Sequence, residues 1–572
     1  MADRIPVLIV GGGPVGLALA GDLGYRGVKS LLVEARGGTI FQPKMDMIGI
    51  RSMEFCRRWG ITDDVHSAGY NRDYIQDCAW VTNLNGYEFG REEFPAPKDE
   101  KNPLQSPEHR ERCPQNFFDP VLKRFAGSTG DSEIRYRTEL VSFVDHGDHV
   151  TATLRDRVAD TTYDVEADFL VGSDGGDSTV RNRLGIEMSG EGALTYTSNA
   201  IIECDGLEDL HTTAPAYRYI FIGPEGTWAT LVAINGRDHW RFSLIGDETQ
   251  RDVSEDEMRA AVVRAVGREF DFTILSMLPW VRRQLVADSY RSGRVFLAGD
   301  SAHLTSPTGG FGMNTGLLDA VNLSWKLAAV IQGWGGEVLL DSYEYEQRPI
   351  AIRNVTESGD NLRRMLGPRV AKPKPEVFDD DSPETEAARR EYGDAYTEAM
   401  KREWHSIGIH LGYVYEGSPI VVPDGSPMPP LTVQTYEQNA RPGSRAPHAW
   451  LAEDRSTLDE FGKEFVLMRF DGGIDTGDLT QAATDAGIPL RLVDIDNAEV
   501  RELYGTPLTL VRPDGSVAWR GHDAPRRPRV TRTSCRWPSG SGDTRIGPIP
   551  SQSARDGADP VLDRLGAVVD GT

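Results

Sequence analysis

Residues 7–16 read VLIVGGGPVG and decide the fold at the start of the chain. The apolar run is typical of a buried parallel strand, and the Ala- and Leu-rich residues from about 14 to 23 predict a helix. Residues 31–33, Leu-Leu-Val, predict the next strand of a β-α-β unit. The pattern Gly11-x-Gly13-x-x-Gly16 lies at the turn between strand and helix, where glycines let a pyrophosphate approach the helix N-terminus. Glu34 ends the second strand, at the position from which a carboxylate contacts an adenosine ribose.

Composition narrows the classes of function. The chain has 572 residues, with 62 Lys and Arg against 87 Asp and Glu, for a formal net charge of -25. Such a field repels phosphate backbones and anionic membrane surfaces, so we expect neither nucleic acid nor membrane as a partner. No apolar run approaches the roughly 20 residues of a membrane span, and no leader precedes the first strand, so a cytoplasmic protein is expected.

Two later motifs distinguish between the dinucleotides. Asp174-Gly175 follows an apolar run within residues 169–186, and Gly299-Asp300 follows another within residues 293–327. In this order, and with the N-terminal unit, they resemble the class A flavoprotein monooxygenases, the aromatic hydroxylases related to p-hydroxybenzoate hydroxylase and phenol hydroxylase. The resemblance covers roughly residues 5–360. It implies FAD as the cofactor, with NADPH or NADH as cosubstrate.

The resemblance also implies roles for single residues. Asp300 would hydrogen-bond the ribityl chain, and Pro307 to Asn314 would wrap the isoalloxazine with backbone groups at a helix N-terminus, which suit the anionic edge of reduced flavin. Asp174 and Gln115 match positions beside the cofactor, although a turn-capping aspartate and a surface glutamine remain alternatives. For His303 we favour packing or local hydrogen bonding. The expected cofactor-binding set is Gly11, Gly13, Pro14, Gly16, Glu34, Lys44, Gln115, Asp174, Asp300, Pro307, Gly312, Met313 and Asn314.

The segment Pro43-Lys44-Met45-Asp46 departs from the family pattern, because many relatives have Arg-Ala where this chain has Lys44-Met45. Lysine still supplies charge to a phosphate but loses the bidentate fork of arginine. Asp46 falls where phenol hydroxylase carries an aspartate against the substrate hydroxyl, and it is our candidate catalytic residue. Burial beside the flavin would raise its pKa and make it a better base. The alternative is a loop aspartate in solvent.

The predicted fold class is α/β, with a Rossmann-type FAD-binding domain interleaved with a β-sheet substrate domain and a thioredoxin-like domain at the C-terminus. Residues 442–448 and 510–521 carry the second resemblance. This region has no C-x-x-C pair, so dithiol chemistry is not expected. The expected limits are 1–365 for the FAD-binding and substrate domains (substrate part mainly 75–110 and 187–290), 366–430 for a helical segment and linker, 431–525 for the thioredoxin-like domain and 526–572 for a poorly ordered tail.

Taken together, the motifs predict an FAD-dependent, NAD(P)H-consuming monooxygenase that hydroxylates a phenolic or related aromatic compound. The resemblance implies that O2 is captured as a flavin C4a-hydroperoxide. No metal-ligand cluster stands out in the sequence, and no metal is expected. Two other classes stay open: another flavin oxidoreductase, such as a reductase or dehydrogenase, and a non-catalytic flavin-binding sensor or scaffold. A homo-oligomer also stays open.

Overall fold

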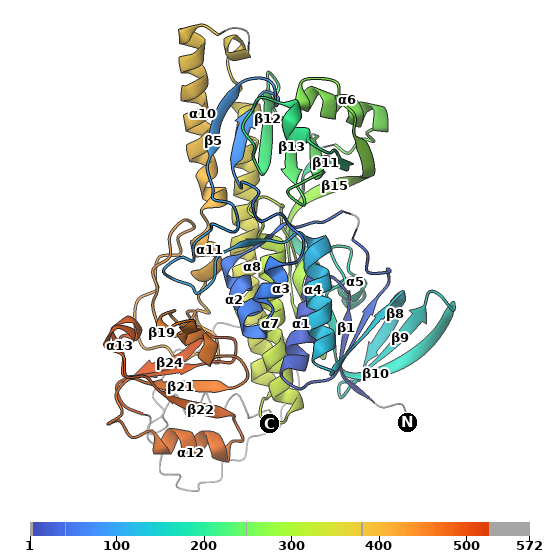
Figure 1. Cartoon of the computed structure of the whole chain (residues 1–572). Coiled ribbons are helices and arrows are strands. Elements are labelled where there is room, and N and C mark those ends of the chain that lie inside the picture. The colour runs from blue at the N-terminus through green and yellow to red at the C-terminus, as the bar shows by residue number, and fades with distance from the viewer. Residues whose placement is uncertain (1–3, 41, 247–248, 379–380, 525–572) are drawn as a thin grey trace.

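The computed structural model describes residues 4–40, 42–246, 249–378 and 381–524 (Figure 1). The β-α-β unit predicted at the N-terminus lies at the centre of the first sheet, where β1 pairs in parallel with both β2 and β10. Its residues Val7, Leu8 and Ile9 are completely buried, as expected for a parallel strand covered on both faces. The sheet runs in the order β16 (Arg291–Ser292), β17 (Val295–Leu297), β10 (Thr161–Gly172), β1 (Ile5–Val10), β2 (Ser30–Glu34) and β7 (Ser132–Tyr136), and β9 (Val150–Asp156) and β8 (Thr138–Asp145) continue from β10.

Helices cover this sheet (Figure 1). The helix α1 (Pro14–Tyr25) packs between α4 (Gln115–Ser128) and α7 (Phe311–Ile331). The sequence predicts a helix that starts at about Asn314. The helix α7 begins three residues earlier, at Phe311, because Gly309 and Gly310 adopt left-handed φ angles of 89° and 67° and turn the chain into the helix. The remaining helices of this part are α2 (Ile50–Trp59), α3 (Thr62–His66) and α5 (Thr179–Leu184).

A second sheet lies beyond the first, with α6 (Glu255–Val266) near its outer edge (Figure 1). The segment after β17 passes through the 3-10 turn η2 (Gly299–Ser301) into β18, so one short stretch of chain joins both sheets. A two-stranded sheet of β3 (Met47–Ile48) and β6 (Glu111–Arg112) adds a further connection. The order of the second sheet is β18 (His303–Leu304), β15 (Thr273–Ala287), β11 (Met188–Glu203), β14 (His239–Ile245), β13 (Gly226–Ala233), β12 (Arg218–Gly223), β4 (Cys78–Val81) and β5 (Glu88–Glu92).

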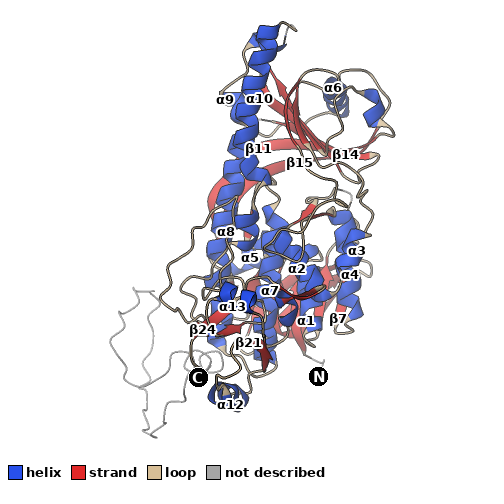
Figure 2. Ribbon diagram, turned by 60° about the vertical axis from the view of Figure 1, so that its left-hand side comes forward, coloured by secondary structure: helices blue, strands red, loops and turns tan. Residues whose placement is uncertain are grey.

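Three helices rise beside the second sheet (Figure 2): α8 (Glu337–Met365), α9 (Gly367–Val370) and α10 (Pro383–Trp404). The Pro-, Asp- and Glu-rich composition of residues 371–386 predicts a solvated linker. That prediction was partly wrong, because η3 (Pro375–Phe378) and the first turn of α10 lie there. Ser382 caps α10 by accepting a hydrogen bond from the N–H of Thr385, and Pro383 occupies the first turn, where it needs no N–H partner. The acidic composition that suggested a linker also suits a helix start.

The C-terminal part follows α11 (Ile407–Leu411) and forms a separate four-stranded sheet. In this sheet β21 (Phe465–Arg469) pairs in parallel with β22 (Leu490–Asp494) and antiparallel with β23 (Leu508–Val511), and β24 (Val517–Gly521) forms the edge. The accompanying elements are β19 (Trp450–Ala452), β20 (Arg455–Ser456), η4 (Thr457–Glu460), α12 (Gly477–Asp485) and α13 (Ala498–Tyr504). Within the described ranges, no helix combines the length and apolarity that crossing a membrane requires. The predicted tail, residues 526–572, lies outside those ranges.

Candidate functional site

The turn after β1 forms a cradle of the shape that a pyrophosphate needs. A Cβ on Gly11, whose φ is 112°, would lie 2.3 Å from the carbonyl oxygen of Ser173, and one on Gly16 would lie 2.0 Å from the carbonyl oxygen of Gly11. Around Gly13, by contrast, a Cβ would meet nothing within 4 Å, and no side chain caps the first turn of α1, which Pro14 opens. The free backbone N–H groups of this turn therefore face open space, which fits an anionic ligand.

Glu34 lies beside this cradle at the end of β2. Its Oε2 accepts a hydrogen bond of 2.8 Å from the N–H of Gly12, and its Oε1 accepts one of 2.7 Å from the N–H of Arg36. A carboxylate has about four acceptor positions, so lone pairs remain for ribose hydroxyls. The geometry is compatible with the ribose contact that the sequence predicts.

The carboxylate of Asp174 is used within its own loop. Its Oδ1 accepts a hydrogen bond of 2.5 Å from the hydroxyl of Ser178, and its Oδ2 accepts one of 3.1 Å from the N–H of Val180. The alternative of a turn-capping aspartate is therefore observed, and a direct contact with the cofactor stays a prediction. Arg181, on the following helix, donates to the carbonyl oxygen of Ser301 at 3.0 Å and so ties this loop to the one that carries Asp300.

The side chain of Asp300 is 44% exposed and lies 3.8 Å from Nζ of Lys44, so two predicted cofactor residues from distant segments meet here. Behind them, the buried ring of His303 lies 2.8 Å from Oδ2 of Asp319, which also accepts the N–H of Gly299 at 2.9 Å. Burial alone would lower the pKa of His303, but the Asp319 carboxylate outweighs it and raises the pKa. The local hydrogen-bonding role predicted for His303 is confirmed, and the pair holds the turn that presents Asp300.

The N-terminus of α7 resembles that of α1 in lacking a side-chain cap and acidic residues in its first turn. Its backbone N–H groups are thus suited to an anionic edge of a ligand. The carbonyl of Pro307 accepts the N–H of Gly310 at 3.1 Å, which closes the preceding turn. Gly312 permits a close approach, because a Cβ there would lie 2.6 Å from Oγ1 of Thr305, and Met313 is buried.

The side chain of Asn314 connects the start of α7 to the start of α2. Its Oδ1 accepts hydrogen bonds of 2.7 Å from the N–H of Gly49 and from the hydroxyl of Ser52. Its Nδ2 donates to the carbonyl oxygens of Met47 at 3.2 Å and Gly310 at 2.7 Å. The amide thus fixes the turn before α7, and the role expected for Asn314 toward the cofactor falls to its backbone.

Gln115 is buried, so the alternative of a surface glutamine is wrong. Its Oε1 accepts the N–H of Lys44 at 3.2 Å, and its Nε2 donates to Oδ2 of Asp119 at 3.2 Å. Burial raises the pKa of Asp119 to about 7, which leaves this acid poised between its two protonation states near neutrality. Gln115 therefore joins α4 to the segment that carries Lys44 and Asp46.

Asp46 lies between the two sheets, and the alternative of a solvent-exposed aspartate is wrong, since only 16% of its side chain is exposed. Its Oδ1 accepts from Arg112 at 3.3 Å, and its Oδ2 accepts from Arg241 at 3.2 Å and from the hydroxyl of Tyr217. Burial alone would raise the pKa of Asp46, but the two guanidinium groups and the tyrosine outweigh it and lower the pKa. The expectation of a raised pKa was therefore wrong, because the sequence did not reveal these partners.

Three arginines act on this carboxylate: Arg112 on β6, Arg218 at the start of β12 and Arg241 on β14. A fourth, Arg282 on β15, lies near Arg218 and Arg241, and we call these four residues the inner arginine cluster. Arg218 pairs with Glu403 at 2.9 Å, while Arg282 donates only to the hydroxyl of Thr197, at 3.2 Å. Within the described part of the chain, the buried Nη1 of Arg282 and Nε of Arg218 have no hydrogen-bond partner. Burial, followed by the charge of Arg218, lowers the pKa of Arg282 to about 9. These residues were missed at the sequence level, although arginines within the apolar runs around 218 and 241 were a signal.

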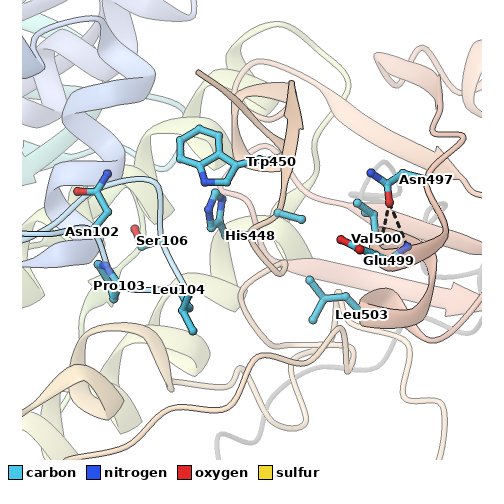
Figure 3. A pocket seen from close by; sticks show the side chains of 11 residues that line it. Asn102, Pro103, Leu104, Ser106, His448, Trp450, Asn497, Glu499, Val500 and Leu503 are labelled. Carbon is cyan, nitrogen blue, oxygen red and sulfur yellow. Dashed lines mark hydrogen bonds between the residues drawn. The ribbon is translucent and has the colours of Figure 1, made fainter. Parts of the chain in front are cut away.

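A cavity of about 390 Å³ lies elsewhere, between the loop of residues 102–106 and the C-terminal sheet (Figure 3). Trp450 stands over His448 at its wall, and Leu104 points outward with 90% of its surface exposed. None of the predicted cofactor residues lines this cavity. We therefore do not assign it to the dinucleotide.

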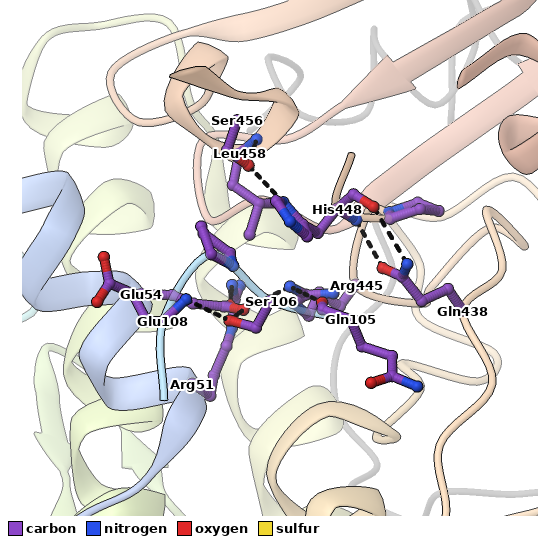
Figure 4. Close-up of polar contacts among 12 residues, drawn as sticks. Arg51, Glu54, Gln105, Ser106, Glu108, Gln438, Arg445, His448, Ser456 and Leu458 are labelled. Carbon is purple, nitrogen blue, oxygen red and sulfur yellow. Dashed lines mark hydrogen bonds and ion pairs between the residues drawn. The ribbon is translucent and has the colours of Figure 1, made fainter. Parts of the chain in front are cut away.

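The C-terminal part is joined to the rest of the chain by buried ion pairs (Figure 4). Glu54, on α2, accepts hydrogen bonds from Arg51 at 2.6 Å, from Ser106 at 2.6 Å and from both Nε and Nη2 of Arg445. These contacts lower the pKa of Glu54 to about 2, although burial alone would raise it. A second buried carboxylate, Glu346, pairs with Lys326 at 2.7 Å and with Arg512 at 2.6 Å.

A substitution that does not destabilise the apoprotein can test whether the cradle binds the cofactor. Gly13→Ala is expected to leave the thermal unfolding temperature of the apoprotein within about 2 °C of wild type, because nothing surrounds the added methyl group. The same methyl group occupies the place where a pyrophosphate must approach, so FAD affinity should fall at least about tenfold. Gly127→Ala, which also meets nothing within 4 Å but lies on α4, is the matched control. Equal FAD affinity in both variants would show that Gly13 does not border the cofactor.

Comparison with known proteins identifies families and sequences that are similar to this chain. A family described as FAD binding domain matches residues 4–358, and one described as aromatic-ring hydroxylase, C-terminal, matches residues 439–539. The chain is 32% identical to the 4-methyl-5-nitrocatechol 5-monooxygenase of a Burkholderia species, with 93% of this chain and 96% of the relative covered. It is 32% identical to the aklavinone 12-hydroxylase of Streptomyces purpurascens, with 91% and 96% covered.

A solved structure gives a similar match. The structure of chromopyrrolic acid-soaked RebC with bound 7-carboxy-K252c shares 38% sequence identity with this chain and has a TM-score of 0.83. The match covers 91% of this chain and 97% of that one. It therefore includes both sheets and most of the C-terminal part.

Proposed function

The chain belongs to the FAD-dependent aromatic-ring hydroxylases, and from this premise we propose that its substrate is an aromatic compound bearing an acidic group, such as a carboxylate. The predicted fold class, FAD as cofactor and aromatic monooxygenase activity follow from that membership. We propose NADH or NADPH as the electron donor, as inferred from the sequence. Reduced FAD supplies the activated oxygen when it is bound. The acidic group on the substrate is the new element of the proposal.

The unpaired donor of Arg282 carries this proposal. The inner arginine cluster contains four guanidinium groups. The carboxylates that contact it are those of Asp46 and Glu403, so positive charges outnumber negative ones. Burying a charge without a partner is costly, and proteins avoid it unless a ligand supplies the counter-charge. An anionic substituent hydrogen-bonded to Nη1 of Arg282 would satisfy that atom and neutralise part of the excess charge.

The position of the cluster supports a substrate rather than a surface ion. Asp46 belongs to the same chain segment as Lys44, which lies 3.8 Å from Asp300, and Asp300 is a predicted flavin contact. Asp46, which accepts hydrogen bonds from Arg112 and Arg241, therefore connects these two arginines with the segment that carries the predicted cofactor residue Lys44. The protein as a whole carries a formal charge of -25, so this local excess of positive charge runs against the general composition. A local field of this sign favours entry of an anion.

One of the related structures supports an acidic aromatic substrate. The RebC structure cited above was soaked with chromopyrrolic acid and contains 7-carboxy-K252c, and both names describe compounds with carboxyl groups. The nitrocatechol monooxygenase and the aklavinone hydroxylase are named for other aromatic compounds. We therefore place the specificity of this chain in its arginines rather than in the family fold. The residues Asp46 and Tyr217 would orient the ring by hydrogen bonds.

The proposal is tested by binding rather than turnover. Hydroxynaphthoic acid and its primary amide serve as a probe pair, and the perturbation of the flavin absorbance reports their binding to the FAD-loaded protein. The wild type is expected to bind the acid about tenfold more tightly than the amide, since a hydrogen bond to a charged group contributes about 1.5–3 kcal/mol. Arg282→Met should abolish this preference and should not destabilise the ligand-free protein, because it removes an unpaired buried charge.

Arg283→Met is the matched control, since Arg283 is the next residue on β15 but is 37% exposed and faces Asp177 at 3.6 Å. It should keep the preference for the acid. Equal affinity of the wild type for acid and amide would contradict the proposal. So would an unchanged preference in Arg282→Met.

A further inference from the structure

Three side chains meet on the outer side of β6, away from the flavin residues. His66 ends α3, and His109 and Glu111 stand two residues apart in an extended segment, which places them on one face. Nε2 of His66 lies 3.4 Å from Oε2 of Glu111, and Nε2 of His109 lies 3.7 Å from the same oxygen. The side chain of Glu111 is completely buried. Two imidazole nitrogens thus converge on one carboxylate oxygen.

The tautomer of His109 follows from its neighbour. Asn102, whose side chain also lines the cavity of Figure 3, places its Oδ1 2.7 Å from Nδ1 of His109. Its Nδ2 donates to the carbonyl oxygen of Pro107 at 2.5 Å, which fixes the orientation of the amide. Because Oδ1 can only accept, Nδ1 of His109 carries the proton, and in the neutral ring Nε2 presents a lone pair. That lone pair faces the carboxylate of Glu111.

In this arrangement the two histidine nitrogens are left without partners. The Nε2 atoms of His66 and His109 are both shielded from solvent and have no hydrogen-bond partner among the residues that the structure describes. A lone pair that faces a carboxylate at this distance is repelled by it. A metal-ligating histidine characteristically donates its other ring N–H to a carbonyl or carboxylate, as His109 does to Asn102. The three atoms therefore have the orientation of a ligand set.

We propose that His66, His109 and Glu111 bind a Zn²⁺ ion, with water as the fourth ligand. Bonds of about 2.0–2.2 Å in a tetrahedral site place neighbouring ligand atoms about 3.3–3.6 Å apart, close to the observed 3.4 and 3.7 Å. Two histidines and one glutamate also form a known zinc ligand set. Arg72 donates to Oε2 of Glu111 at 2.8 Å and remains as an outer partner of that ligand, where its charge limits the affinity.

The ion braces the strand that carries a residue of the inner arginine cluster. Glu111 is followed directly by Arg112, whose N–H donates to Oε1 of Glu111 at 3.0 Å and whose guanidinium contacts Asp46. Holding Glu111 therefore holds the backbone of Arg112. The site has no part in oxygen transfer, and it does not depend on the acidic substrate proposed above. The two proposals can fail separately.

The test is isothermal titration of ZnCl₂ into the FAD-loaded protein after removal of metals with a chelator. The wild type is expected to bind one Zn²⁺ per chain and to unfold at a higher temperature when Zn²⁺ is present. His66→Ala and His109→Ala should each lower the affinity at least tenfold, with FAD content unchanged. Asn102→Ala, which removes no ligand, should lower it about tenfold by releasing the ring of His109.

His239→Ala is the control, because Glu203, Asp238 and His239 form a second, more exposed group of side chains whose ligand atoms lie close enough together to hold a metal ion. This variant should bind Zn²⁺ like the wild type. The proposal is overturned if the wild type binds no Zn²⁺, or if only His239→Ala loses binding. For variants that do not fold, crystals of the wild type soaked in ZnCl₂ decide the question. The proposal requires a peak in the anomalous difference map, measured at the zinc edge, between the side chains of His66, His109 and Glu111.

Discussion

Asp46→Asn is expected to slow hydroxylation about 100-fold while FAD stays bound, an effect equivalent to about 3 kcal/mol in the transition state. The carboxylate of Asp46 accepts hydrogen bonds from Arg112, Arg241 and Tyr217. Asparagine keeps the shape but leaves the two arginines without their shared counter-charge. Because the amide keeps only one acceptor oxygen, either Arg112 or the pair of Arg241 and Tyr217 faces an NH2 group instead, and the groups expected to orient the aromatic ring shift. NAD(P)H oxidation should continue, with peroxide released instead of hydroxylated product, so the ratio of product to NAD(P)H consumed measures the effect.

The pH dependence separates this role from that of a proton acceptor. The arginines and Tyr217 hold the pKa of Asp46 below its ordinary value, so the carboxylate stays ionised at every pH above that value. A folded-state pKa that is depressed means that the ionised form is retained down to acidic pH. We therefore expect no rescue of Asp46→Asn between pH 6 and about 9, where a missing base would be compensated by ionisation of a phenolic substrate. Recovery of hydroxylation at high pH would instead identify Asp46 as the base.

Tyr217→Phe provides a second measurement of the same contact. It removes the hydroxyl that donates to Asp46 but leaves the ring over which Arg112 lies at 3.6 Å. A smaller loss of coupling than in Asp46→Asn is expected, because no charge is left unpaired. Asp205→Asn, far from the cluster in sequence and exposed, is the matched control for the loss of one carboxylate. If Asp46→Asn couples NAD(P)H oxidation to hydroxylation as well as this control, Asp46 has no part in the reaction.

The fold was predictable where an element is specified by residues that are close together in the sequence. The apolar run at Val7–Val10, the glycine turn and Glu34 form a unit whose internal strand pairing, β1 with β2, is close in sequence, and the structure has it at the centre of the first sheet. The start of α7 was placed three residues late, because the left-handed glycines before it were read as part of a loop. The helix α10 was partly read as a linker, since acidic residues and prolines occur both in solvated loops and in first helical turns.

The residues on the substrate side of the site were less predictable, because they come from strands that are far apart in the sequence. Asp46 was found from a short motif, but its environment comes from Arg112, Tyr217 and Arg241, which lie 66 to 195 residues away. No local pattern contains that information, so the direction of its pKa shift was predicted wrongly. The unpaired donor of Arg282 was unpredictable for the same reason, because it depends on which residues surround Arg282 in the folded sheet. A polar residue inside a strand-like apolar run is the one signal that sequence offered.

Glu54→Gln is expected to destabilise the protein by about 3–5 kcal/mol, the cost of leaving buried charges without a partner. Glu54 lies between Arg51 and Arg445, and its side chain is 2% exposed. Glutamine cannot neutralise either guanidinium group. Because the same helix, α2, begins at the backbone that Asn314 holds, FAD retention should weaken as well. Chemical denaturation followed by circular dichroism, together with the fluorescence of released FAD, measures both effects.

The pH dependence of the free energy of unfolding shows whether the ion pairs of Glu54 stabilise the fold. The pKa of Glu54 falls from 4.5 to about 2 in the folded protein, mainly because Arg445 and Arg51 outweigh the opposing effect of burial. A depressed pKa stabilises the fold above the unfolded value, and that stabilisation is lost as pH falls from about 4.5 towards 2. In Glu54→Gln this component of acid unfolding should be missing. The difference in stability between wild type and variant should therefore shrink over that interval.

The exposed pair of Glu464 and Arg491, at 2.9 Å with side chains 37% and 40% exposed, is the matched control. Glu464→Gln removes the same charge by the same change, and its cost should be only about 0–1 kcal/mol because water screens the pair. The contrast isolates burial as the cause. If Glu54→Gln costs no more than Glu464→Gln, the ion pairs do not hold the C-terminal part in place. Its attachment would then rest on apolar contacts such as those of Trp325 and Trp334 with Phe465.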